Sequence, residues 1–190
     1  MASLKVAVDF VLRQEDSTLS GEITTLKGDN GGATRFGLAS TDHPELVPEG
    51  YFDESRVSRD QALAIAEQVY GTQYGGPLHV VAIVDQAVAT AVLSMGINSG
   101  TARAAKVLQT ACSALGRALE ADGDIGPKTL GVVNALNADQ LLASFSTQAD
   151  GFYRDLAEQD ANDLPFLQGW ENRVAAWTKN AASLRAQAQA

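Results

Sequence analysis

The feature that most constrains this chain is one segment, Val80 to Met95, that is apolar on nearly every side when it is drawn as a helix. A helix with one apolar stripe can lie on a surface, but a helix that is apolar all round must be surrounded by other elements. We therefore expect this segment at the centre of the fold. A chain of 190 residues is long enough to build one compact body around it.

Apolar residues at helical spacing predict further helices on both sides of this segment. Ser58 and Gln61 have the spacing of a capping box, and Pro127 and Asn137 mark two more helix starts. Residues 20–37, rich in glycine and threonine, break the helical pattern, and the tail after Ser183 is expected to fray. The sequence thus predicts a mainly α, lysozyme-like helical fold with a short irregular or β-hairpin loop near the N-terminus. The expected helices cover about residues 4–15, 59–70, 80–95, 101–115, 127–136 and 138–159, with a last one after residue 165.

Composition excludes several classes of partner and site. Cys112 is the single cysteine, so neither an intrachain disulfide nor a thiolate zinc site can form. The net charge of -9 argues against nucleic acid, whose phosphates are bound by clustered Lys and Arg. No apolar stretch reaches the roughly 18 residues of a membrane span, and His43 and His79 are isolated. We expect a monomer with no metal, no cofactor and no stable membrane insertion.

Glu15 is the candidate for acid chemistry. It continues the apolar stripe of the first predicted helix, after Val8, Val11 and Leu12, and lies near the end of that helix. Desolvation and the negative end of the helix dipole both disfavour a charged carboxylate there. Glycoside hydrolysis needs one carboxyl group that is still protonated, so Glu15 is a candidate general acid. An acidic residue near a helix end can equally be a solvated surface group.

The loop from Gly28 to Thr34 offers candidates for the second catalytic role. Asp29 is a carboxylate, Thr34 has a hydroxyl that can orient water, and glycines allow a sugar to approach the backbone closely. An acid and a base in an inverting glycosidase lie about 6.5–9.5 Å apart, which a helix end and an adjoining loop can span. Asp29 could instead close an Asx turn, and Thr34 could bond to the backbone.

Together these residues resemble the helical lysozymes of glycoside hydrolase family 108, which occur as phage endolysins and bacterial muramidases. In that family the first helix ends with Glu-Gly-Gly-Tyr, and an Asp-Pro-Gly-Gly-x-Thr-x-x-Gly-Ile loop follows. Glu15 and the segment from Asp29 to Leu38 are similar to these two pieces. The resemblance implies that Glu15 protonates the departing sugar oxygen and that Asp29 and Thr34 place the attacking water.

The second half resembles the peptidoglycan-binding region of the same family. The similar segments are Asn98-Ser99-Gly100, Asp122 to Leu130, and Gly169-Trp170 with Arg173. We therefore expect residues 1–100 to form a lysozyme-like catalytic region and residues 101–190 a helical peptidoglycan-binding-like region. The two regions are expected to pack together as one compact lobe.

The resemblance implies a bacteriolytic muramidase that hydrolyses the β-1,4 bond between N-acetylmuramic acid and N-acetylglucosamine in the glycan strands of peptidoglycan. A phage endolysin is the expected context. The residues after Met1 run into Asp9 and Arg13 before any apolar signal segment could form. We expect synthesis in the host cytoplasm and action in the periplasm or cell wall after holin-type release.

Candidate substrate-binding residues are Tyr51, Tyr74 and Asn98. Tyrosines at helical spacing, such as Tyr70 and Tyr74, also fit the edge of a core, and Asn98 could simply cap a helix end.

One departure from the family pattern keeps other functions open. Asp16-Ser17 stands where the family has Gly-Gly, and glycine is often required where φ is positive. The alternative functions are a non-catalytic peptidoglycan-binding protein and a secretion accessory with a lysozyme-like fold.

Overall fold

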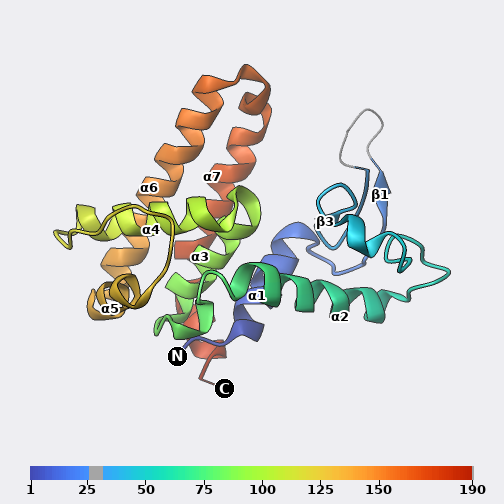
Figure 1. The fold of residues 1–190 in the computed structure, drawn as a ribbon, viewed down its shortest axis with the longest axis horizontal. Helices are drawn as coiled ribbons and strands as arrows, with labels where there is room; N and C mark the ends of the chain where they lie inside the picture. Colours follow the sequence, from blue (N-terminus) through green and yellow to red (C-terminus); the bar gives the residue numbers. More distant parts are fainter. Residues whose placement is uncertain (26–31, 190) are drawn as a thin grey trace.

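The computed structural model describes residues 1–25 and 32–189 of the chain. Helices dominate this part, and a three-stranded antiparallel sheet in the order β1-β2-β3 lies near the N-terminus (Figure 1). The predicted mainly α fold with a β-hairpin near the N-terminus is therefore confirmed. The helices are α1 (Leu4–Glu15), α2 (Arg59–Val69), α3 (Gln86–Ser99), α4 (Thr101–Ala114), α5 (Pro127–Ala135), α6 (Ala138–Gln159), α7 (Leu164–Lys179) and α8 (Ala181–Gln187), and the strands are β1 (Thr24–Thr25), β2 (Ala33–Arg35) and β3 (Leu38–Ala39).

Helix α3 occupies the centre, as its sequence predicts. Every residue from Gln86 to Gly96 is buried, and α1, α4, α6, α7 and α8 all pack against it. The predicted start at Val80 is wrong. The carboxylate of Asp85 accepts a hydrogen bond from the Val88 N–H at 3.0 Å and caps the helix there, so Val80–Ala82 forms only a 3-10 turn.

The predicted helix starts follow from capping chemistry. Ser58 and Gln61 form both hydrogen bonds of the capping box at α2, and the Asn137 side chain accepts from the first turn of α6. The prediction that the tail after Ser183 frays is wrong. Residues 181–187 form α8, since Leu184 is buried and the Arg185 Nε donates to Asp85 Oδ2 at 2.7 Å.

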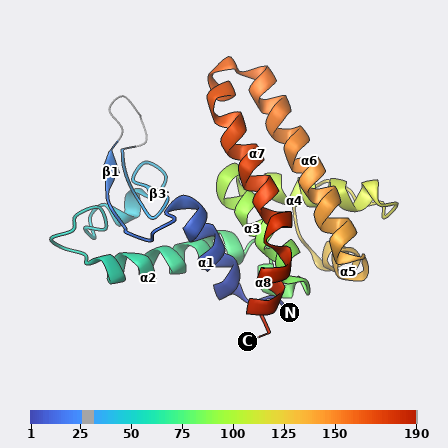
Figure 2. The same ribbon diagram turned by 180° about the vertical axis from the view of Figure 1, so that it is seen from behind.

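Two parts of the molecule extend to the same side of α1 and α3. One is the sheet lobe, which we define as residues 16–25 and 32–58. The other is the α6–α7 hairpin, in which α7 is the helix nearer to the sheet lobe in both views (Figures 1 and 2). The two termini lie close together at the opposite end. The C-terminal end of α1 points between these two parts.

A single hydrophobic core joins the two halves of the sequence. It includes Val11 and Leu93 from the first half and Phe145 and Trp177 from the second. The expected division between residues 100 and 101 stays a prediction. Within the described residues, the helices are too short or too polar to cross a lipid bilayer.

Candidate functional site

A buried arginine organises the sheet lobe next to the candidate site. Arg35 at the end of β2 is 1 % exposed, and its guanidinium donates to the backbone carbonyls of Gly21, Tyr51 and Val57 at 2.9–3.0 Å. It also lies over the Tyr51 ring, 5.8 Å from its centroid. A buried cation is tolerated only when such acceptors compensate for its lost water. Arg35 therefore ties the loop after α1 and two points of the segment before α2 to the sheet.

The turn between β2 and β3 presents a glycine to Glu15. Phe36 and Gly37 form a two-residue hairpin turn, and both have positive φ, 49° and 78°. This conformation is unfavourable for phenylalanine, but the Phe36 ring is buried against Gly21 and the Phe36 carbonyl accepts a hydrogen bond from the Tyr70 hydroxyl at 2.9 Å. A Cβ atom on Gly37 would meet the Tyr70 hydroxyl at 2.5 Å and Glu15 Cγ at 2.8 Å.

Glu15, the last residue of α1, is held by an arginine from the far end of the chain. The Arg173 Nη1 of α7 donates to Glu15 Oε1 at 2.6 Å, and the two side chains are 17 % and 21 % exposed, Arg173 and Glu15 respectively. The surroundings of Glu15 are thus not the purely apolar ones that the sequence suggested. The pair joins the first helix to the α6–α7 hairpin and remains accessible to solvent.

The hydroxyl of Tyr70 completes this group. Tyr70 is 1 % exposed, and burial, together with the negative charge of Glu15, raises the pKa of its hydroxyl. Tyr70 is therefore a neutral donor that fixes the turn beside Glu15.

Asp16, the residue that replaces glycine in the family pattern, has a clear role after α1. Its carboxylate accepts hydrogen bonds from Thr18 N–H, the hydroxyls of Thr18 and Ser20, and Gly21 N–H at 2.8–3.2 Å. Burial opposes its ionisation, but these hydrogen bonds outweigh burial and lower its pKa to about 2. Its own φ is -137°, an extended conformation that needs no glycine. The end of α1 is thus held by hydrogen bonds to the Asp16 carboxylate.

The structure brings one of the two predicted water-placing residues into the same hairpin as Gly37. Thr34 is half-buried in β2 and pairs with Thr24 and Ala39. Because Arg35 points into the core, its strand neighbour Thr34 faces the other side of the sheet. Asp29 lies outside the described residues, so its role stays a prediction.

The predicted sugar-contacting residues lie in three different environments. Tyr51 is 0 % exposed and its hydroxyl donates to the Arg35 carbonyl at 3.1 Å, so its assignment as a substrate-contacting residue is wrong in this conformation. Tyr74 is half-buried and packs on Tyr70 with ring centroids 5.9 Å apart. Asn98 is exposed, and its Nδ2 donates to the Ser94 carbonyl one turn earlier in α3.

Sequence reasoning did not place Arg173 or Gly37 beside Glu15, and it favoured the edge of the core for Tyr70. Arg173 is 158 residues from Glu15, and no local pattern reports a contact over that distance. Gly37 did carry a signal, since glycine is a preferred residue at the positive-φ positions of a tight hairpin turn.

A sizeable cavity in the described part of the chain lies elsewhere. It has a volume of about 510 Å³, and Val84, Asp85 and Arg185 are among its lining residues, which do not include Glu15. Arg185 is already paired there with Asp85 and Asp139. We therefore do not place the chemistry in this cavity.

Comparison with known proteins gives two findings. Residues 103–175, from α4 to α7, match the family described as "Predicted Peptidoglycan domain". This match connects the chain with peptidoglycan. The whole chain also has the fold of the solved structure titled "Structure of Brucella abortus SagA", with a TM-score of 0.68, 24 % sequence identity, and coverage of 96 % of this chain and 95 % of that one. No curated protein sequence matches the chain.

Proposed function

We propose that this protein is a muramidase that hydrolyses the β-1,4 bond between N-acetylmuramic acid and N-acetylglucosamine, with Glu15 as the general acid. The observation that carries the proposal is the position of Glu15. It lies at a helix end, partly exposed, between a β-hairpin turn and an arginine of the region that matches a peptidoglycan domain. The resemblance to glycoside hydrolase family 108 supplies the chemistry.

Arg173 acts in this proposal as a positioning residue. Its guanidinium holds the Glu15 carboxylate in one orientation. Proton donation requires Glu15 to be neutral when the glycan is bound. Thr34, and Asp29 by the family resemblance, place the water on the opposite side of the bond.

The proposal extends to the setting of the reaction. The resemblance supports a phage endolysin that is made in the host cytoplasm and reaches the cell wall after holin-type release. Peptidoglycan strands are its polymeric substrate.

Digestion of purified peptidoglycan tests the chemistry. The wild-type protein is expected to release fragments with reducing muramic acid ends, identified by mass spectrometry. Glu15→Gln is expected to lower the rate at least about 100-fold, the contribution of a general acid. Glu22→Gln, an exposed carboxylate of the sheet lobe, is the matched control and should digest like wild type. Equal rates for Glu15→Gln and Glu22→Gln would exclude Glu15 as the acid.

A second candidate function is a non-catalytic peptidoglycan-binding protein. The ion pair between Glu15 and Arg173 favours it, because the same contact can serve only to link α1 to α7. The same experiment separates the two functions. A binder sediments with peptidoglycan and releases no fragments, whereas anhydro ends would indicate a lytic transglycosylase.

A further inference from the structure

Helix α7 carries a row of side chains that leads from the tip of the α6–α7 hairpin to Glu15. Phe166, Trp170 and Arg173 are spaced four and three residues apart, so they lie on one face of the helix. At 1.5 Å per residue the row extends over about 10 Å. Arg173 ends it with the 2.6 Å contact to Glu15.

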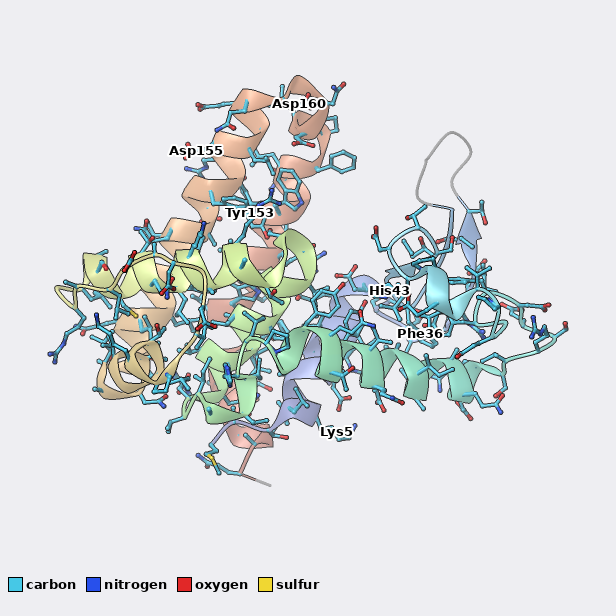
Figure 3. The ribbon with its side chains drawn as sticks, in the orientation of Figure 1. Lys5, Phe36, His43, Tyr153, Asp155 and Asp160 are labelled. Carbon is cyan, nitrogen blue, oxygen red and sulfur yellow. The ribbon has the colours of Figure 1, made fainter. Side chains whose placement is uncertain are left out.

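Ring contacts hold this row in place. The Trp170 ring stacks on Tyr153 of α6, with centroids 5.1 Å apart and planes at 23°. Phe166 packs at a tilt against Trp170, with centroids 6.1 Å apart. Tyr153 is buried, accepts a hydrogen bond from the Ser99 hydroxyl at 3.0 Å, and lies within the hairpin in Figure 3. We call Phe166 and Trp170 the aromatic row.

The outer part of the row faces solvent. Phe166 is 60 % exposed and Trp170 is partly exposed. An exposed aromatic side chain that is ordered by its neighbours is a typical binding element, because it offers a large rigid surface at little loss of conformational entropy. Both residues lie inside the segment that matches the peptidoglycan domain.

Charge favours a sugar ring as the occupant. The chain has a net charge of -9, and cell wall is also largely anionic, so long-range attraction cannot bring the two together. The apolar C–H face of a pyranose ring can instead pack on the electron-rich face of an aromatic ring. Such contacts do not depend on charge.

We propose that the aromatic row is a glycan-binding platform that seats sugar units of a peptidoglycan strand beside Glu15. The identity of this ligand rests on the proposed function. Because the row continues into the Arg173–Glu15 pair, the bound strand runs along α7 toward Glu15. The sugar next to Arg173 is the one whose glycosidic bond reaches the carboxyl group.

Sedimentation with insoluble peptidoglycan tests the platform. All variants are made in the Glu15→Gln protein, so that digestion does not remove the polymer. Phe166→Ala is expected to weaken binding about fivefold to tenfold, as for an exposed aromatic anchor, and Phe166→Trp is expected to retain it. Leu164→Ala is the matched control, because Leu164 is 55 % exposed and lies on the opposite face of α7 from Arg173. Leu164→Ala should bind like the parent.

Equal binding by the Phe166→Ala and Leu164→Ala proteins would overturn the platform. So would gel filtration that shows a dimer lost only in Phe166→Ala while sedimentation is unchanged, since the row would then contact a second copy of the chain. Binding that depends on Phe166, together with no fragments from the wild-type protein, would leave the platform and remove the hydrolase. Digestion that depends on Glu15 but not on Phe166 would keep the hydrolase and remove the platform.

Discussion

The sheet lobe and the α6–α7 hairpin lie on either side of Glu15, and different forces hold them. In the sheet lobe, charged side chains bond to the backbone: Arg35 binds three carbonyls and Asp16 organises the loop after α1. In the hairpin, aromatic rings stack, as Phe145 does on Trp177 with centroids 5.4 Å apart. Among the described residues, the buried Ser146 hydroxyl and the Trp177 Nε1 of the hairpin have no hydrogen-bond partner.

This difference follows from the length of the elements. Strands of two or three residues cannot bury enough apolar surface or form a long enough ladder to hold themselves together. Two long amphipathic helices bury a continuous stripe and need few polar contacts. Removing a buried polar group should therefore destabilise the sheet lobe more strongly than the hairpin.

The largest effect is expected at Arg35. Arg35→Met leaves three carbonyls without their donor, and we expect a loss of about 3–5 kcal/mol in the free energy of unfolding, measured by urea denaturation. Arg56→Met is the control, because Arg56 also donates to a carbonyl, that of Pro48, but is exposed. A loss at Arg35 no larger than that at Arg56 would contradict the proposed basis of sheet-lobe stability.

Gly37→Ala is expected to have the next largest effect. Its φ of 78° disfavours any side chain, and the new Cβ would also press on Tyr70 and Glu15. Gly116 has the same φ of 78° with nothing within 4 Å of a new Cβ, so Gly116→Ala measures the backbone strain alone, about 1 kcal/mol. We expect Gly37→Ala to lose about 1–3 kcal/mol more than that and to slow peptidoglycan digestion. Equal losses in Gly37→Ala and Gly116→Ala would show that a Cβ atom at position 37 does not press on Tyr70 or Glu15.

Asp16→Asn is expected to destabilise the protein by about 1 kcal/mol at pH 7, after allowance for solvent screening. The pKa of Asp16 is lowered from 3.8 to about 2 in the folded protein. Its contribution is therefore complete above about pH 4 and is lost as the pH falls toward 2. Thermal unfolding of the wild-type and Asp16→Asn proteins from pH 7 to pH 2 measures this, with Glu22→Gln as the control. A stability difference that is independent of pH would exclude the carboxylate as its source.

The smallest effect is expected at Ser146 in the hairpin. Ser146→Ala removes a buried hydroxyl that has no partner among the described residues, so stability should stay the same or rise by up to about 1 kcal/mol. Ser144→Ala on the same helix removes the hydrogen bond to the Ala111 carbonyl and should cost about 0.5–1.5 kcal/mol. If Ser146→Ala lost as much stability in urea denaturation as Arg35→Met, the contrast between the two regions would fail.

Local chemistry made the helices predictable. The capping box at Ser58, the asparagine before α6 and the all-apolar α3 are each read from neighbouring residues, and the structure confirms them. Two predictions failed where contacts distant in the sequence were involved. The Tyr51 ring is buried, and its hydroxyl donates to the Arg35 carbonyl. Residues 181–187 are helical because Leu184 is buried and Arg185 reaches Asp85.

The sequence by itself determined where most of the longer helices lie, which helix is central and which carboxylate ends the first helix, because these properties depend on residues a few positions apart. Only the tertiary structure decided that Arg173 would meet Glu15, that Gly37 would pack beside it and that an aromatic row would lead there. Such contacts depend on how helices pack in three dimensions, and a one-dimensional pattern does not report packing between residues that are far apart in the chain.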